Sequence, residues 1–384
     1  MTKGLFINQS SVVSGAETVL INLIKNLSEI DFDLEPIVAT PSEGLLNDRI
    51  RDMGIRAVTI PFPMIYRTRN PIRLASFLLG YMKSGWKLLK LLQYEKIDFI
   101  HINHFRCLLT LRLIHWAYPV NVVWHVHDIF DCYWLNKLLL KWGTRSVNTL
   151  ICVSQAVRKN MIDLGISGSK CQVIYNFGPV KLPSKPKTNL RKELGLSSNT
   201  PIVGCIGQLA EWKGQDVFVE AAQITSQSIK KVNFVIIGDI VDNKEVGYRT
   251  KILRTIEDAK QTCEIHWLGF KPNILQLISQ IDIVVHSSNK SDPLPTVIIE
   301  AMSQNRVVVG TNVGGVPELI DHNKTGLVVP KQDPHSLSNA IKWLLENPQI
   351  AIDMGNAGRT KLDTLQNTDE TLLFWKSIYI GCSQ

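Results

Sequence analysis

The sequence predicts an α/β protein built from two doubly wound domains, each with a parallel sheet covered by helices on both faces. Short runs rich in Val, Ile and Phe alternate with helical patterns along almost the whole chain, which is typical of βαβ units. The 384 residues, 45% of them hydrophobic, are enough for two cores. A segment rich in Pro and Lys, without periodicity, separates the two sets of strands and predicts a linker at 178–190.

The expected strands follow one another at the spacing of βαβ units. In the first domain, predicted over 1–177, they are GLFIN (4–8), PIVAT (36–40), AVTIPF (57–62), DFIHIN (98–103), NVVWHV (121–126), TLICVS (149–154) and CQVIYN (171–176). In the second domain, predicted over 191–365, they are PIVGCIG (201–207), NFVIIG (233–238), EIHWLGF (264–270), IDIVVHS (281–287), RVVVGTN (306–312) and TGLVVP (325–330). A last helical pattern at 366–384 is expected to pack back and complete the first domain, with four apolar residues available for burial: Leu372, Leu373, Trp375 and Ile378. Ligands of such sheets bind beyond the carboxyl ends of the strands, so we expect both domains to face a central cleft.

Composition narrows the class of protein. The sequence has no apolar run of about 18 residues and no cleavable signal at its start, which predicts a cytoplasmic protein. Its seven cysteines include no CxxC pair, so we expect reduced thiols and neither a zinc site nor a disulfide framework. The absence of GxxxxGK and GxGxxG motifs argues against a P-loop and a dinucleotide fingerprint.

Positive charge is concentrated in the first half of the chain. Residues 1–180 hold 20 Lys and Arg against 13 Asp and Glu, whereas the remainder holds 22 against 21. Within this half, Asn70 can cap a helix that starts at Pro71, and six apolar positions of that helix are expected in the core: Leu74, Phe77, Leu78, Tyr81, Leu88 and Leu92.

The same segment offers a basic surface with an aromatic residue. A contact with an anionic membrane surface or with an acceptor phosphate would use Arg67, Arg69, Lys83, Trp86 and Lys87. The alternative is a solvated face over core leucines. We expect no nucleic-acid partner.

One lysine stands at a place suited to an anion. IGQLAEWKGQDVFVEAA (206–222) predicts the end of a strand, a loop and then a helix that starts near Gly214. Lys213 would lie beside the unpaired amides of the helix start, where the helix dipole also favours phosphate. The alternative is a solvated surface lysine.

Two carboxylates stand eight positions apart in SDPLPTVIIEAM (291–302), Asp292 in a loop and Glu300 in the helix that follows. Pro295 is expected as the first helical residue, so that Thr296 and Val297 offer free amides at the helix start. Glu300 would then be able to accept hydrogen bonds from vicinal hydroxyls such as those of a ribose. Alternatively, Asp292 is only a helix cap and Glu300 a surface acid.

Glycine turns accompany these helix starts. GTNVGGVPELI (310–320) predicts a strand and a turn whose amides can approach a ligand, because Gly314 and Gly315 carry no Cβ. NQSSVVSGAETVLINLI (8–24) repeats the arrangement with a strand end, a loop, Gly15 and a helix. Each domain would therefore contribute a glycine-led helix start to the cleft.

The order of these motifs resembles a known family. SGAE near the start, GQLAEWKGQD after the linker, FVIIGD, WLGF, DPLPTVIIEAM, GTNVGGVPELI and NKTGLVVP are similar to the retaining glycosyltransferases of family GT4, which have the GT-B fold of two Rossmann-like domains. The resemblance spans nearly the full chain and is more specific in the second half. It implies a donor-sugar contact from Asp292, a ribose contact from Glu300 and a diphosphate contact from Lys213.

Further roles follow from the same resemblance. It implies that amides of Thr296 and Val297 contact the diphosphate, that Gly15 faces the reacting centre, and that the base is seated near Phe270 and Lys271. It also places a histidine near the donor sugar, which here is His127 of VVWHVHD (122–128). His101, His104 and His125 are expected in the core or behind the site.

This sequence departs from the family pattern at three places. Asp292 stands where Glu is usual, so its reach is one methylene shorter. Gln208 stands where an arginine is usual in the donor site, so Lys213 has less cationic help unless Lys290 compensates. The turn that ends the first domain reads YNFG, so Asn176 is expected to act only as a hinge.

The sequence therefore predicts a metal-independent hexosyltransferase that requires no cofactor and acts with retention, with Asp292, His127 and Lys213 at the reacting centre. The expected donor is a UDP-sugar, UDP-glucose first. The expected acceptor is a saccharide or polyprenyl-linked saccharide of envelope or exopolysaccharide biosynthesis, at the inner face of the plasma membrane. A nucleotide-sugar epimerase of the same fold and a non-catalytic nucleotide-sugar binding module are the alternatives.

Overall fold

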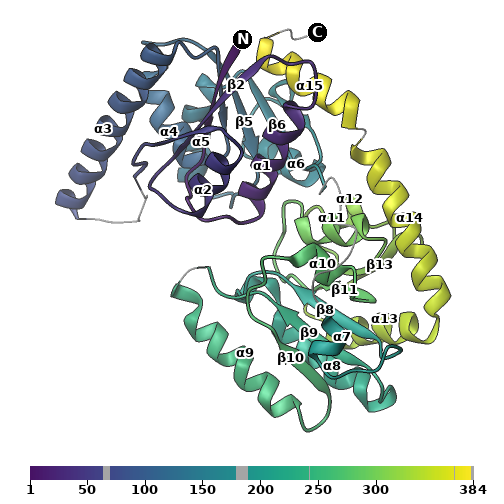
Figure 1. The fold of residues 1–384 in the computed structure, drawn as a ribbon. Helices are drawn as coiled ribbons and strands as arrows, with labels where there is room; N and C mark the ends of the chain where they lie inside the picture. The colour runs from purple at the N-terminus through teal and green to yellow at the C-terminus, as the bar shows by residue number, and fades with distance from the viewer. Residues whose placement is uncertain (64–69, 179–188, 242, 367, 382–384) are drawn as a thin grey trace. The chain divides into compact units, whose positions relative to one another are not determined.

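Two parallel sheets organise the chain, one in each of two α/β units (Figure 1). The computed structural model describes residues 1–63, 70–178, 189–241, 243–366 and 368–381. The first unit comprises Met1–Phe177 together with Asn367–Gln384, and the second comprises Gly178–Gln366. Within the described ranges, every helix is too short or too polar to span a membrane.

The sheet of the first unit has seven parallel strands in the order β3-β2-β1-β4-β5-β6-β7. They are β1 (Thr2–Ile7), β2 (Leu34–Thr40), β3 (Arg56–Thr59), β4 (Phe99–Ile102), β5 (Asn121–Val126), β6 (Thr149–Cys152) and β7 (Cys171–Val173). Each overlaps the stretch in which the sequence predicts a strand. The strand order reverses direction between β1 and β4, and ligands of doubly wound sheets bind beside such a reversal.

Helices cover this sheet (Figure 1). They are α1 (Gly15–Leu27), α2 (Leu45–Asp52), α3 (Pro71–Glu95), α4 (Phe105–Ile114), α5 (Trp134–Gly143), η1 (Thr144–Ser146), α6 (Gln155–Asp163), η2 (Gly168–Lys170) and α15 (Thr368–Ile380). Every residue of β4 is buried, as expected for a central parallel strand between two layers of helices.

Helix α15 comes from the far end of the sequence and packs against this sheet. Trp375 is buried, the Tyr379 hydroxyl lies 2.8 Å from Nδ1 of His101, and Nδ2 of Asn121 donates to the carbonyl of Ile378 at 2.6 Å. Leu373, which was expected to be buried, is exposed. It stands about 100° around the helix from Leu372, so it points away from the face that packs on the sheet.

Helix α3 begins as the sequence predicts. The side chain of Asn70 accepts hydrogen bonds from the amides of Ile72 and Arg73, and Pro71 is the first helical residue. Leu88 and Leu92 are buried as expected. Leu78 was also expected in the core, but its side chain is exposed.

The second unit has a six-stranded parallel sheet in the order β10-β9-β8-β11-β12-β13. Its strands are β8 (Ile202–Ile206), β9 (Asn233–Ile237), β10 (Glu264–Trp267), β11 (Ile283–His286), β12 (Val307–Thr311) and β13 (Gly326–Val329). Its helices are α7 (Leu190–Glu193), η3 (Glu211–Lys213), α8 (Gln215–Ser228), η4 (Asn243–Glu245), α9 (Val246–Ala259), α10 (Ile274–Ile278), α11 (Thr296–Ser303), α12 (Val316–Leu319), α13 (Pro334–Glu346) and α14 (Pro348–Gln366). All six strands overlap their predicted stretches.

Candidate active site

Lys213 ends the short helix η3, and one residue separates it from the start of α8. Gly214, between the two helices, has a φ of 67°, and a Cβ at this position would lie 2.2 Å from the carbonyl oxygen of Ser287. Only glycine fits this close approach of the two loops without a shift of the backbone. The approach brings Nζ of Lys213 to 2.6 Å from Oδ2 of Asp292.

Asp292 is buried between a lysine and a histidine. Nε2 of His286 lies 3.1 Å from the same Oδ2 that Lys213 contacts. Burial alone would raise the pKa of Asp292, but the charge of Lys213 and the hydrogen bond from His286 together hold that pKa well below its usual range. The carboxylate is therefore ionised, and its charge is balanced by the adjacent ammonium.

The glycine turn after β12 supports the loop that carries Asp292. A Cβ on Gly314 would lie 1.9 Å from the carbonyl oxygen of Asp292, and the amide of Gly315 donates to that same oxygen at 2.9 Å. The expectation that these amides approach a ligand is wrong for Gly315, because its amide already has a protein acceptor. The two glycines are needed so that this turn can pack against the Asp292 loop.

Helix α11 follows that loop. It begins at Thr296, one residue later than predicted, because Pro295 has the extended ψ of 114° of a capping residue. The amides of Thr296 and Val297 are at the helix start, where no helical carbonyl can accept from them.

Glu300 lies one turn further along α11, and most of its surface is buried. Among the described residues, its carboxylate has no hydrogen-bond or ion-pair partner. Burial raises the pKa of Glu300 to about 7. The protein thus keeps an unpartnered carboxyl near its midpoint of ionisation at neutral pH.

The other predicted donor-site residues of the second unit lie after β8, β10 and β11. Gln208 is half-buried, and its backbone carbonyl accepts from Nε2 of Gln215 at 2.8 Å. Phe270 is exposed and Lys271 is partly exposed in the loop after β10. Lys290 is exposed, two residues before Asp292.

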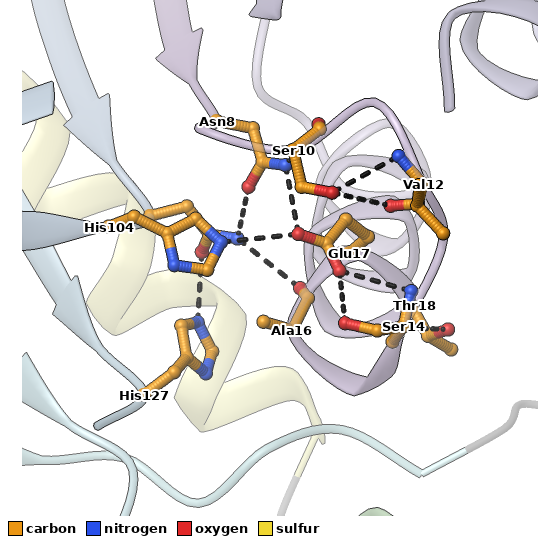
Figure 2. Close-up of polar contacts among 10 residues, drawn as sticks. Asn8, Ser10, Val12, Ser14, Ala16, Glu17, Thr18, His104 and His127 are labelled. Carbon is orange, nitrogen blue, oxygen red and sulfur yellow. Dashed lines mark hydrogen bonds and ion pairs between the residues drawn. The ribbon is translucent and has the colours of Figure 1, made fainter. Parts of the chain in front are cut away.

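The first unit contains a buried polar network at the ends of three neighbouring strands (Figure 2). Asn8 follows β1, Asn103 follows β4 and His127 follows β5. Nε2 of His127 lies 2.8 Å from Oδ1 of Asn103, and Nδ2 of Asn103 donates to Oδ1 of Asn8 at 2.9 Å. Nδ2 of Asn8 in turn donates to Oε1 of Glu17, also at 2.9 Å.

Glu17 anchors this network from the first turn of α1, two residues after Gly15. Its Oε2 accepts from the amide and hydroxyl of Ser14, and its Oε1 lies 3.1 Å from Nε2 of His104. Although burial opposes ionisation, these contacts lower the pKa of Glu17 to about 2. The carboxylate is ionised, so it can only accept hydrogen bonds.

Two further histidines of the first unit belong to its core, as expected. His101 and His125 are buried, with ring centroids 5.5 Å apart, and His101 contacts Tyr379 of α15. Burial lowers the pKa of His101 to about 3 and, with a smaller effect from nearby histidines, that of His127 also to about 3. All three rings are neutral at physiological pH.

Two family models match this chain. The family model for glycosyl transferases group 1 matches residues 186–361, and the model for glycosyltransferase family 4 matches residues 13–178. The chain belongs to this family of glycosyltransferases.

Several relatives are similar over most of their length. An Escherichia coli UDP-Gal:α-D-GlcNAc-diphosphoundecaprenol α-1,3-galactosyltransferase is 26% identical over 96% of this chain and 94% of its own. A Bacillus anthracis N-acetyl-α-D-glucosaminyl L-malate synthase is 25% identical over 76% of this chain and 77% of its own. The crystal structure of Anabaena HepE with UDP-glucose has a TM-score of 0.81 at 23% identity, covering 98% of this chain and all of HepE. The fold of this glycosyltransferase is therefore the predicted GT-B fold.

Sequence reasoning missed four polar residues of this glycosyltransferase. Glu17 had a signal, because Ser14 and Glu17 have the spacing of a capping box and form one. Asn8, Asn103 and His286 each stand at the end of a predicted strand, but a single polar residue at a strand end is too common to single out.

Two further sequence predictions concern metal binding and the basic surface of α3. Within the described ranges, no group of three or more His, Cys, Asp or Glu is placed to hold a metal ion. Lys83, Trp86 and Lys87 are exposed on α3, whereas Arg67 and Arg69 lie outside the described residues.

The state of Glu300 in this glycosyltransferase gives a testable prediction. If a ribose hydroxyl donates to its carboxylate, the ionised form binds better, so UDP affinity should fall as pH decreases below about 7. Glu300→Gln should bind UDP about tenfold more weakly at pH 8, because a hydrogen bond to a charged group is lost. UDP itself titrates in this pH range, so its affinity depends on pH for both proteins. The additional pH dependence of UDP affinity that comes from Glu300 should be present in wild type and absent from the variant.

Calorimetric titration of both proteins with UDP at several pH values checks this prediction. Equal UDP affinity of the variant and wild type at pH 8 would rule out the ribose contact. Glu318→Gln, which changes an acid in helix α12 instead, serves as the control and should bind UDP as wild type does.

Proposed function

We propose that the chain is a retaining glycosyltransferase that moves a hexose from a nucleotide diphosphate sugar to a hydroxyl of a saccharide or lipid-linked saccharide. The product would belong to an envelope or exopolysaccharide pathway. The observation that carries the proposal is the ion pair between Lys213 and Asp292, near the start of α8 and beside the loop that leads into α11. It sets a cation for a leaving diphosphate beside a carboxylate that can accept from a sugar hydroxyl.

The leaving group would be stabilised without a divalent metal. Negative charge grows on the diphosphate as the glycosidic bond breaks, and preorganised donors aimed at that charge lower the barrier. Lys213 and the amides of Thr296 and Val297 are suited to this task, and Glu300 to the ribose. The departure at Gln208 leaves Lys213 as the principal cation, and the exposed Lys290 would compensate for the arginine that is usual at position 208.

Retention would follow from attack on the face that the diphosphate leaves. The bond from C1 to the diphosphate oxygen breaks, a bond from the acceptor oxygen to C1 forms, and the acceptor proton passes to a diphosphate oxygen. The products are an α-glycoside, from an α-linked donor, and the nucleoside diphosphate. His127 would contact the donor sugar, and Gly15 would lie at the reacting centre.

UDP-glucose is the donor to test first. HepE, which shares the fold, was crystallised with UDP-glucose, and the E. coli relative is named for UDP-galactose, which differs in configuration at one carbon. Phe270 and Lys271 are the residues that we assign to the base. A thermal-shift panel of UDP, GDP and ADP tests the nucleotide, and stabilisation by GDP alone would overturn the choice of uridine.

Release of UDP from UDP-glucose, with and without saccharide acceptors, tests the class of activity. A transferase should release UDP faster when an acceptor is present. A nucleotide-sugar epimerase would convert its substrate without need of an acceptor, and a binding module would turn nothing over. Either of these results would overturn the proposal.

Helix α3 supports a peripheral contact with an anionic membrane at the cytoplasmic face. Four apolar side chains form one solvent-facing stripe at helical spacing, the α3 stripe: Ile72, Leu79, Met82 and Trp86, exposed by 79%, 66%, 66% and 57%. Lys83, Lys87 and Lys90 are exposed along one border of this stripe. Apolar side chains bordered by lysines are typical of helices that lie in the membrane interface.

The lysines of α3 should control binding to anionic lipid. Lys83→Gln with Lys87→Gln should weaken binding to vesicles that contain phosphatidylglycerol by about 2 kcal/mol, since each surface charge contributes about 1 kcal/mol. Co-sedimentation measures the change, and added salt should weaken wild-type binding as well. Lys324→Gln with Lys331→Gln removes the same charge from the second unit and should have no such effect. If neither the α3 substitutions nor added salt changes vesicle binding, the exposed face of α3 is only a solvated surface.

A further inference from the structure

We propose that Asn103 is a positioning residue that fixes His127 in the tautomer with hydrogen on Nε2, so that His127 offers a ligand only the acceptor Nδ1. His127 would then recognise a hydroxyl that donates a hydrogen bond, and it could not donate to a phosphate or carbonyl oxygen. The assignment depends on the direction of each hydrogen bond in the network of Figure 2.

The orientation of the Asn8 amide is set by two neighbouring groups that can only accept hydrogen bonds. Nδ2 of Asn8 contacts Oε1 of Glu17 at 2.9 Å and the carbonyl oxygen of Ser10 at 2.7 Å. A carboxylate and a backbone carbonyl have no hydrogen to donate, so the amide nitrogen of Asn8 must face them. The oxygen of Asn8 is thereby turned toward Asn103.

The amide of Asn103 is oriented in the same way. Its Nδ2 lies 2.9 Å from Oδ1 of Asn8 and 3.3 Å from the carbonyl oxygen of Ala16, both of which only accept. Its Oδ1 therefore faces Nε2 of His127, at 2.8 Å. An amide oxygen can only accept, so Nε2 of His127 carries the hydrogen and donates it.

The network is rigid enough to hold this direction. Asn8 and Asn103 are fully buried, and Glu17 is 1% exposed. Reversing either amide would place its oxygen against a carboxylate or a carbonyl oxygen. Contacts with Ser14 and His104 keep Glu17 ionised. The ionised carboxylate fixes the orientation of Asn8, Asn8 fixes that of Asn103, and Asn103 fixes the tautomer of His127.

His127 can therefore contact a ligand only as a hydrogen-bond acceptor. Nε2 of His127 donates to Asn103, and among the described residues Nδ1 of His127 has no hydrogen-bond partner, while the side chain is partly exposed. Because the ring is neutral, Nδ1 is a lone-pair acceptor. The further step, that the donor of this bond is a hydroxyl of the donor sugar, rests on the proposed function.

Nitrogen NMR of the full chain with isotope-labelled histidine tests the tautomer without any ligand. The two ring nitrogens have distinct shifts and couplings when protonated or bare, and the His127 signals are assigned by their loss in His127→Gln. We expect a bare Nδ1 and a protonated Nε2 in wild type. Asn103→Leu should give His127 a mixture of tautomers, while the signals of His101, bonded to Tyr379, should stay unchanged. A protonated Nδ1 in wild type would overturn the proposal even if the Leu variant does not fold.

A matched pair of substitutions tests the ligand contact. The amide of His127→Asn takes the place of Nδ1, whereas that of His127→Gln takes the place of Nε2 and can still donate to Asn103. We expect kcat/KM for UDP-glucose to be about tenfold higher for the Asn variant, since a hydrogen bond is kept there and lost in the Gln variant. A more active Gln variant would refute the Nδ1 contact. A wild type that releases no UDP but has the expected tautomer would refute the proposed function and the sugar contact, and leave the role of Asn103 standing.

Discussion

Lys213→Ala should lower kcat on the order of a hundredfold, while the KM for the donor changes much less. The reason is that charge on the diphosphate grows as the glycosidic bond breaks, so the ammonium stabilises the transition state more than the bound donor. The loss corresponds to about 3 kcal/mol, as for removal of one preorganised donor from an anion site. Steady-state kinetics of UDP release measures both parameters.

Two further variants separate this effect from instability. Lys213→Ala leaves the buried carboxylate of Asp292 without its cation, so the variant should also be less stable. Adding Asp292→Asn should recover part of the stability and none of the turnover. Lys290→Ala, which removes an exposed lysine from the same loop as Asp292, should be nearly neutral unless Lys290 replaces the missing arginine. A raised donor KM with unchanged kcat in Lys213→Ala would refute the role of Lys213.

Gly314→Ala should reduce the free energy of unfolding by more than about 2 kcal/mol and should also reduce turnover. Its φ is 53°, which costs an L-residue about 1–2 kcal/mol, and the new Cβ would lie 1.9 Å from the carbonyl oxygen of Asp292. The loop must move to relieve this contact, and Asp292 moves with it. Urea unfolding and UDP release measure the two effects.

Gly195→Ala is the matched control for this substitution. Gly195 lies in the same unit with a similar φ of 66°, but a Cβ there would meet nothing within 4 Å. It should cost only the backbone strain of about 1–2 kcal/mol and leave kcat unchanged. If both alanine variants have the same stability and the same turnover, the close packing of Gly314 on the Asp292 loop does not matter for the site.

The sequence predicted the sheets well because buried parallel strands have a strong pattern. Runs such as IDIVVHS and RVVVGTN are continuous and β-branched, and both became buried strands of the second sheet. The loop and helix of SDPLPTVIIEAM were also correct to within one residue, since Pro295 favours a helix boundary. These signals are local, so one segment is enough to reveal them.

Features that depend on distant segments were missed or mistaken. The amides of Gly314 and Gly315 were expected to approach a ligand, but the amide of Gly315 donates to the carbonyl oxygen of Asp292, in a loop some twenty residues earlier in the chain. Glu17 and His104 meet only when β1 and β4 become neighbours in the sheet, which no local pattern encodes. Leu78 was assigned to the core because it falls near helical spacing with Leu88 and Leu92, and sequence periodicity cannot tell over how much of its length a helix face is covered.

Transfer of a labelled hexose tests whether the chain is a retaining glycosyltransferase. UDP-glucose labelled with an NMR-active isotope at its anomeric carbon is incubated with the full chain and a polyprenyl-diphosphate-linked saccharide, and the labelled carbon is followed by NMR. We expect the signal to move from the α-linked donor to an α-glycoside of the acceptor. A β-glycoside would contradict retention, and a signal that remains in UDP-glucose or appears only in free glucose, in the presence of every acceptor offered, would contradict glycosyl transfer from this donor.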